Sequence, residues 1–271
     1  MSDNELGAFI RARREALRPE AVGLPAGTRR RTPGLRRAEL AVLAGLSVDY
    51  LVRIEQGRDR RPSGQVLMAL ADALRLDESE RQHLKRLGAM TAAPEFCGER
   101  PPAATEIRAT VRTLLDRLEP APALVLNHLS DILAWTTTYD RLARPLGILD
   151  HDPPSLLRYT FGDPRAATTY PEWSRVADEQ VANLRALVWS TSGEADLIDE
   201  LGELGGDEFA RRWRAHPVEA KGVGSKRIVH PDVGELHLRF ETMALADGDG
   251  QRLVVYLPGD EVTAQRLDQL A

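Results

Sequence analysis

The chain has 271 residues, which is enough for one large domain or two ordinary ones. Its single cysteine, Cys97, excludes an internal disulfide, and no apolar run approaches the roughly 18 residues that span a bilayer. The first residues also lack the apolar core of a signal peptide. We therefore expect a protein of the reducing cytoplasm that has no membrane partner.

The net charge of -5 hides an uneven distribution along the chain. Residues 1–90 carry 17 Lys and Arg against 12 Asp and Glu, a net of +5, whereas the remaining 181 carry 19 against 29, a net of -10. A basic segment suits a phosphate backbone, and an acidic one suits a different partner. This asymmetry predicts two domains, over 1–90 and 105–271, joined by a linker over 91–104 with the sequence TAAPEFCGERPPAA.

Apolar residues at helical spacing predict an all-α first domain of five helices. The first helix covers 4–17 and is followed by a loop over 18–34. A helix-turn-helix then occupies 37–56, with Gly45 in the turn and Ser47 as the N-cap of its second helix. Two further helices, over 63–74 and 78–90, complete the predicted bundle.

The second helix of this motif predicts DNA binding, because so short a turn places it outward, where a major groove can receive it. Arg53 can donate two hydrogen bonds to guanine, Val48 can contact a thymine methyl, and Asp49 can accept from cytosine. Asp49 has a second interpretation, as an acid that complements the helix dipole. Tyr50 lies at a position that reaches the DNA backbone.

Several cations around the motif are candidates for phosphate contacts, which set the register of a protein on DNA without reading sequence. We expect such contacts from Arg37, Ser47, Arg58, Arg60 and Arg61. The alternative is that these arginines form a solvated face. Arg29, Arg30 and Arg31 lie in the predicted loop and either enter a minor groove or only strengthen the positive field.

The second domain is predicted to be α+β with an antiparallel sheet. Helical spacing occurs at 107–118, 138–143, 173–190, 194–204 and 207–215. Strand patterns occur at 124–126, 132–135, 226–230, 235–244 and 252–257.

A family resemblance extends these predictions. The residues RRRTPGLRRAELAVLAGLSVDYLVRIEQGRDRRPS resemble the XRE-type helix-turn-helix regulators, and more narrowly the MmyB-like regulators of actinobacteria. The segments DILAWTTTYDRLA, FGDPRAATTYPEW, KRIVHPDVGELHLRFETMAL and RLVVYLPG are similar to the C-terminal ligand-binding domain of that family. The resemblance implies an XRE/lambda-repressor-like helical bundle, a buried ion pair between Arg14 and Glu55, and a PAS-like second domain around an apolar pocket for a fatty acid or similar lipid.

The second domain has a large apolar inventory, which by itself indicates a filled core. Its members are Leu126, Trp135, Tyr139, Leu142, Leu156, Leu157, Tyr159, Phe161, Leu184, Trp189, Phe209, Trp213, Phe240 and Met243. With the resemblance, we expect the ligand to be lined by Leu126, Trp135, Tyr139, Leu142, Leu157, Tyr159, Phe161, Leu184 and Phe240. Arg158, in the apolar run LLRYTF, is our first candidate to meet a carboxylate head group, with Lys226 or His230 as alternatives.

These observations favour a sequence-specific DNA-binding regulator, most simply a repressor, that acts as a homodimer. Its two recognition helices would lie about 34 Å apart on a pseudo-palindromic operator. An alternative makes the acidic second domain a solid-core protein-interaction or dimerisation module without a ligand. An enzyme finds no support, because no catalytic residue can be named and the six histidines lack metal-ligand spacing; we expect no cofactor and no metal.

Overall fold

The computed structural model describes residues 4–25, 33–59, 61–92, 103–187, 192–215, 222–246 and 250–271. They form two compact units. Predictions for Arg29, Arg30, Arg31, Arg60, Cys97 and Trp189 fall outside the described residues. Within these ranges, no helix has the length and apolar character needed to cross a membrane.

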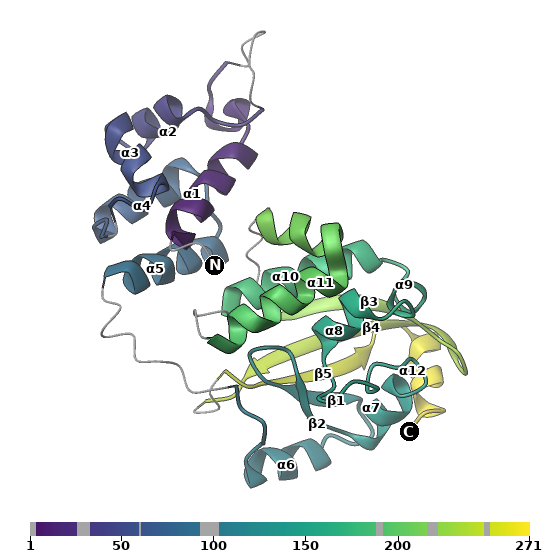
Figure 1. Ribbon diagram of the computed structural model, residues 1–271. Coiled ribbons are helices and arrows are strands. Elements are labelled where there is room, and N and C mark those ends of the chain that lie inside the picture. Colours follow the sequence, from purple (N-terminus) through teal and green to yellow (C-terminus); the bar gives the residue numbers. More distant parts are fainter. Residues whose placement is uncertain are drawn as a thin grey trace. The chain divides into compact units, whose positions relative to one another are not determined.

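The N-terminal unit is helical and contains the helix-turn-helix (Figure 1). Its elements are α1 (Glu5–Ala16), the 3-10 turn η1 (Pro19–Val22), α2 (Arg37–Leu43), α3 (Val48–Glu55), α4 (Gly64–Ala73) and α5 (Glu78–Ala92). Gly45 adopts φ 65° between α2 and α3, a conformation that glycine reaches without steric cost. The Ser47 hydroxyl accepts a hydrogen bond from the Tyr50 N–H and so caps α3. Phe9, Ile10, Leu40, Leu51 and Ile54 are fully buried, which fixes α3 against α1 and α2.

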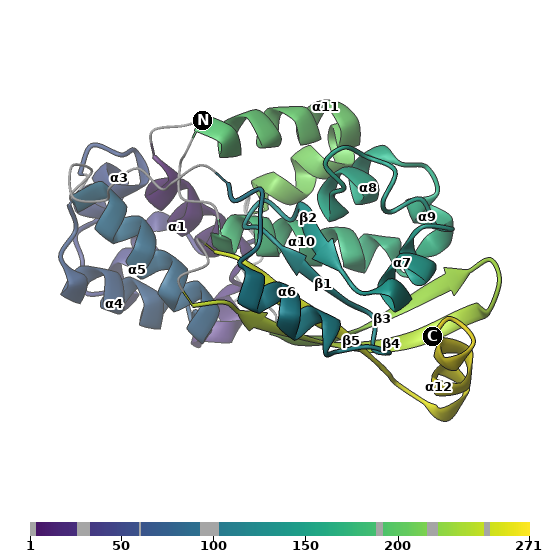
Figure 2. The same ribbon diagram turned by 90° about the horizontal axis from the view of Figure 1, so that it is seen from below.

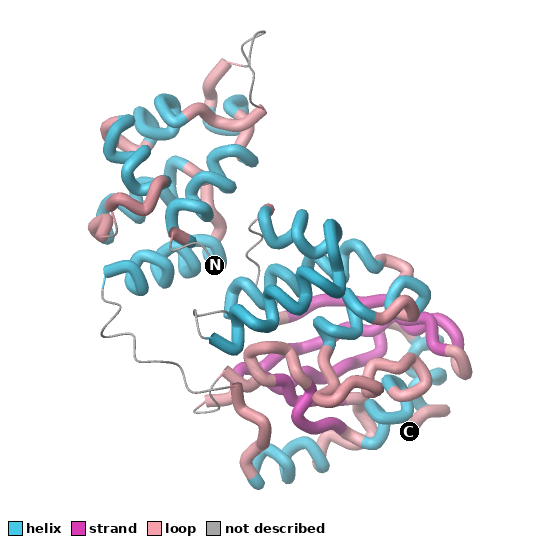
Figure 3. Tube along the Cα trace, in the orientation of Figure 1, coloured by secondary structure: helices cyan, strands magenta, loops and turns pink. Residues whose placement is uncertain are grey.

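The C-terminal unit is built on one antiparallel sheet of five strands, as its sequence pattern predicted (Figure 3). The strands are β1 (Ala123–Leu126), β2 (Ile132–Trp135), β3 (Val223–His230), β4 (Gly234–Ala244) and β5 (Arg252–Pro258). Their order across the sheet is β2-β1-β5-β4-β3. The last strand therefore inserts between β1 and β4, and the central position of β5 is consistent with its run of buried residues, Leu253 to Tyr256.

Helices cover the two faces of this sheet unequally (Figure 2). On one face, α6 (Ala109–Asp116) packs Val111 and Leu115 against β1 and β5. The other face carries the larger core, to which α7 (Thr137–Ala143), α8 (Leu156–Gly162), α9 (Ala166–Thr169), α10 (Trp173–Leu187) and α12 (Glu261–Asp268) contribute. Hereafter this second face is called the inner face.

Three helical features differ from the sequence-based expectation. The sequence pattern predicts no helix at α8 or α9, because α8 is apolar or buried at nearly every position and α9 has only four residues, so neither shows a helical period. Helix α12 was also missed, although Asp260 caps it by accepting from the Thr263 N–H at 2.7 Å. The expected helices at 194–204 and 207–215 are both present within α11 (Ser192–Arg214), where Gly206 separates them with a non-helical φ of 51° and ψ of -136°.

Candidate nucleic-acid interface and ligand cavity

The start of α3 presents its side chains to solvent. Val48, Asp49 and Arg53 are all exposed, and Val48 keeps 41% of its surface accessible although it is apolar. The Arg53 guanidinium lies over the Tyr50 ring, 5.4 Å from its centroid. Burial and the nearby Asp59 carboxylate raise the pKa of the Tyr50 phenol, so its hydroxyl remains a hydrogen-bond donor at neutral pH. This arrangement leaves one apolar, one acidic and one guanidinium group free to meet base edges.

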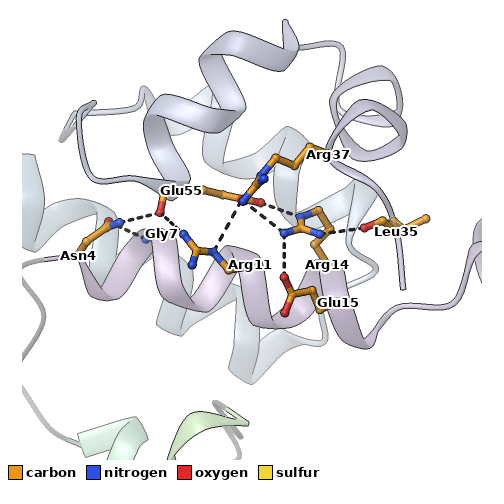
Figure 4. A network of polar contacts seen from close by, with 8 residues as sticks. All are labelled: Asn4, Gly7, Arg11, Arg14, Glu15, Leu35, Arg37 and Glu55. Carbon is orange, nitrogen blue, oxygen red and sulfur yellow. Dashed lines mark hydrogen bonds and ion pairs between the residues drawn. The ribbon is translucent and has the colours of Figure 1, made fainter. Parts of the chain in front are cut away.

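The far end of α3 is anchored by the carboxylate of Glu55, which is fully buried (Figure 4). Arg14 donates to it from Nε at 2.7 Å, and Arg37 donates to its second oxygen at 2.6 Å. Arg11 lies 3.9 Å from the same oxygen and also donates to the Glu55 carbonyl, at 3.1 Å. The structure thus confirms the ion pair between Arg14 and Glu55 and adds two further arginines to it.

The arginines predicted to contact phosphates occupy different environments. Arg58 and Arg61 are exposed after α3, where Gly57 ends the helix with φ 68°. Arg37 differs from the simple expectation of a free surface cation, because its Nε is already bonded to Glu55 while 44% of its side chain stays exposed. Its remaining guanidinium donors, and those of Arg11, are the ones available to a phosphate. Arg11 was not singled out in the sequence, since its position on α1 gives no local signal of its closeness to α3.

The C-terminal unit has a small cavity on the inner face of the sheet, between β1, β3, β4, β5 and α10. Its volume is about 50 Å³. It is lined by Leu126, Ser130, Leu156, Val176, Glu179, Gln180, Asn183, Lys226, Phe240, Thr242, Arg252, Val254 and Tyr256. A cavity of this volume admits a few atoms, whereas pockets for drug-sized ligands measure roughly 300–1,000 Å³.

Lys226 brings a buried ammonium to this cavity. The residue is 6% exposed, and its Nζ lies 5.3 Å from the Tyr170 ring centroid, 5.9 Å from that of Phe240 and 6.0 Å from that of Tyr256. Among the described residues it forms no ion pair. Three aromatic faces attract the cation but leave its hydrogen-bond donors without an anionic acceptor.

Arg252 is a second cation on the same cavity and is also without a carboxylate partner in the described part of the chain. Its Nη2 donates to Ser130 Oγ at 3.2 Å and to the Asn127 carbonyl at 3.4 Å, while its Nε is buried with no hydrogen-bond partner there. Burial in these surroundings lowers the pKa of the Arg252 guanidinium to about 10. One sequence feature indicates that Arg252 faces the inner side of the sheet. It alternates along the strand with Val254 and Tyr256, so all three lie on the same face.

The predicted ligand-lining residues divide between this cavity and the core. Leu126 and Phe240 line the cavity, together with Lys226 from the alternative head-group candidates. Tyr139, Leu142 and Tyr159 are packed in the main core, and Leu157, Phe161 and Leu184 in a second cluster beside α10 and α11. Trp135 is half-buried and donates from its indole N–H to Asp140. His230 bonds to the Arg141 carbonyl and to the Asp232 N–H, so both of its ring nitrogens are already engaged.

Arg158, the first candidate to bind a carboxylate head group, is instead bonded to carboxylates of the protein. Its guanidinium donates to both oxygens of Glu200, at 2.7 and 2.9 Å, and to Asp131 at 2.9 Å. Its bond to Glu200 is the main cause that raises the pKa of Arg158. With two carboxylates already bound, Arg158 joins α8, α11 and the loop after β1 and is not on the cavity.

The two units together define a class of protein, a helix-turn-helix transcription regulator with an attached ligand-binding domain. The model of a helix-turn-helix domain matches residues 5–84. The model described as the MmyB-like transcription regulator ligand binding domain matches residues 107–270, more than half of the chain. The chain therefore belongs to the MmyB-like transcription regulator family, whose two domain types are regulatory rather than enzymatic. No curated protein matches this sequence.

Proposed function

We propose that this protein is a homodimeric repressor that binds a pseudo-palindromic operator through α3 and is controlled by a small apolar ligand, such as a fatty acid, in its C-terminal unit. We propose domain boundaries at 1–90 and 105–271, with 91–104 as the linker. We place the protein in the cytoplasm, where a bacterial-type regulator meets DNA. The ligand acts through a difference in its affinity for the DNA-bound and free states.

The single observation that carries DNA recognition is the exposed start of α3 on a rigid support. Val48, Asp49 and Arg53 face solvent, while the other end of α3 is fixed by the buried Glu55 carboxylate. A contact group held by packed neighbours loses little conformational entropy on binding. We assign base contacts to Val48, Asp49 and Arg53, and backbone contacts to Arg37, Ser47, Tyr50, Arg58, Arg60 and Arg61.

The strand order of the sheet and the cavity on its inner face support the proposed sensory role. A five-stranded antiparallel sheet of order β2-β1-β5-β4-β3, with most of its helices over the inner face, supports a PAS-like assignment. The cavity lies between that face and α10, with Leu126 and Phe240 in its lining. Its volume of about 50 Å³ is too small for an alkyl chain, so the proposal requires that the lining residues move apart before such a chain enters.

The same small volume favours a second function, in which the C-terminal unit is a solid-core interaction or dimerisation module. Extraction of the purified full chain with organic solvent, followed by mass spectrometry, distinguishes a ligand-binding unit from a solid-core interaction module. We expect a lipid in near-stoichiometric amount. An empty extract, together with no ligand effect on operator binding, would favour the interaction module.

DNA recognition is tested on an operator selected from a random-sequence DNA pool by the full chain. Arg53→Ala removes a proposed guanine contact and is expected to weaken operator binding by about 1–3 kcal/mol, roughly five- to 150-fold. Lys85→Ala, which removes an exposed cation of α5, is the matched control. Unchanged affinity of a folded Arg53→Ala protein would contradict the assignment of α3 as the recognition helix.

A further inference from the structure

The buried Glu55 carboxylate gathers guanidinium groups from two helices that precede α3 in the chain (Figure 4). From α2, Arg37 donates from Nε to Oε2 of this carboxylate at 2.6 Å. From α1, Arg11 places its Nε 3.9 Å from the same oxygen. Because both distances end on one atom, the guanidinium groups of Arg11 and Arg37 lie close to each other.

Arg14, the third arginine of the cluster, is engaged by the protein itself. Its side chain is 7% exposed, and it donates to Glu55 at 2.7 Å, to the Leu35 carbonyl at 2.9 Å and to Glu15 at 3.1 Å. These bonds use Nε and both terminal nitrogens, so few donors of Arg14 are left for a group outside the protein. Any such contact therefore falls to the other two arginines of the cluster.

Arg11 and Arg37 differ from Arg14 in their accessibility. Each keeps 44% of its side chain exposed. Among the described residues, Arg37 donates from Nε alone, to the Glu55 carboxylate, and Arg11 donates from Nη2, to the Glu55 carbonyl at 3.1 Å. A guanidinium has five N–H donors. Both arginines therefore keep terminal N–H groups that no described residue accepts from.

The cluster carries an excess of positive charge. Three guanidinium groups, on Arg11, Arg14 and Arg37, meet two carboxylates, those of Glu55 and Glu15, which leaves a net charge of +1. Guanidinium groups held close together repel each other, and an anion between their exposed ends offsets this repulsion. A DNA phosphate has one negative charge and two free oxygens, so it can accept from both guanidinium groups at once.

We propose that Arg11 and Arg37 together bind one phosphate of the DNA backbone, so that α1, a helix outside the helix-turn-helix, takes part in DNA binding. The inference rests on the proposed operator-binding function and deepens it, because that function gives a backbone contact to Arg37 and none to Arg11. Glu55 holds both side chains in place before DNA binds, which keeps the loss of conformational entropy on binding small.

A structural role for Arg11 is compatible with the same contacts. Its bond to the Glu55 carbonyl satisfies an acceptor at the last residue of α3, and the C-terminus of a helix attracts a cation. In that role Arg11 would stabilise the fold and leave the phosphates to other residues. The two roles differ in how the protein responds when a single phosphate loses its charge.

The test uses the full chain and its selected operator, in which one phosphate at a time is replaced by an uncharged methylphosphonate. At the shared phosphate we expect the wild-type protein to lose about tenfold in affinity, because charge-assisted hydrogen bonds are lost. Arg11→Gln and Arg37→Gln should each reduce this loss to about threefold, since one guanidinium of the two remains. The double variant should abolish it. Thermal unfolding checks that each variant is folded, and Arg11→Met, which keeps the apolar stem, replaces Arg11→Gln if that variant is unstable.

Two further variants serve as controls. Arg58→Gln removes a proposed contact to a different phosphate, so it should lose sensitivity at another position and keep the wild-type loss at the shared one. Lys85→Gln removes an exposed cation of α5 and should change the response at no position. If the Arg11 variant keeps the wild-type loss at every position, Arg11 has only the structural role. If the Arg11 and Arg37 variants lose sensitivity at different positions, the shared site is wrong.

Failure of this inference is distinguishable from failure of the proposed function. If Arg53→Ala weakens operator binding while the Arg11 variant responds to every methylphosphonate as the wild type does, the recognition helix stands and the inference about α1 fails. If Arg53→Ala has no effect, the assignment of α3 fails, whatever the phosphate scan shows for Arg11 and Arg37. If the full chain selects no operator, the proposed function fails and this inference fails with it.

Discussion

The two units bury charge in opposite ways. In the N-terminal unit, the Glu55 carboxylate is enclosed by protein but bonded to Arg14 and Arg37, with Arg11 nearby. In the C-terminal unit, Lys226 and Arg252 are cations on a cavity, and neither meets a carboxylate among the described residues. A buried charge that is fully paired supports the fold, whereas one without a counter-charge raises the free energy of the folded state until a ligand supplies it.

The largest expected effect comes from breaking the paired charge. Glu55→Gln leaves Arg14 buried without its anion and should lower the free energy of unfolding of the N-terminal unit by about 3 kcal/mol. Urea unfolding of the full chain measures this change. Glu15→Gln is the matched control, because Glu15 also bonds to Arg14 but is 57% exposed. A loss as small as that of the control would show that Glu55 does not anchor α3.

A smaller loss is expected from crowding the cavity. A Cβ on Gly224 would lie 2.4 Å from the Phe240 ring, so Gly224→Ala must displace a cavity wall. We expect a loss of about 1–3 kcal/mol in the stability of the C-terminal unit, typical of overpacking, together with altered ligand affinity. Gly202→Ala is the control, since a Cβ there meets no atom within 4 Å. Equal stability of the two variants would mean that Phe240 moves freely.

Removing the charge of Arg252 is expected to change stability in the opposite direction from removing that of Glu55. Arg252→Met replaces a partly exposed cation, which has no carboxylate partner among the described residues, with an apolar chain, and we expect the ligand-free protein to gain up to about 1 kcal/mol or to stay unchanged. Thermal unfolding of the full chain measures this change. A loss as large as that of Glu55→Gln would place Arg252 among the structural charges.

The smallest effect concerns the exposed cations beside α3. Arg58→Ala removes one proposed phosphate contact, so operator binding should weaken about equally on all DNA sequences. The slope of log affinity against log salt should become shallower by about 0.9. Titrations at several salt concentrations, with Lys85→Ala for comparison, measure it. A loss confined to the selected operator would instead make Arg58 a base-reading residue.

The sequence determined the parts of this protein that depend on local pattern. Apolar spacing, Gly45 and the Ser47 cap located the helix-turn-helix, and alternation located the strands of an antiparallel sheet, because these signals act within a few residues. The pairing of Arg14 with Glu55 was available from family resemblance. Helix α8 could not be located in the same way, since it is apolar or buried at nearly every position and therefore shows no helical period.

Only the tertiary structure decided which charges are paired. Arg158 was the expected head-group residue, but folding brings Glu200 and Asp131 to it from other elements. Lys226 and Arg252 both line one cavity, although they lie on different strands, because β3, β4 and β5 are neighbours in the sheet. Whether a cation lies beside a carboxylate in the folded protein depends on residues far away in the chain. Local sequence patterns do not show which distant residues come together.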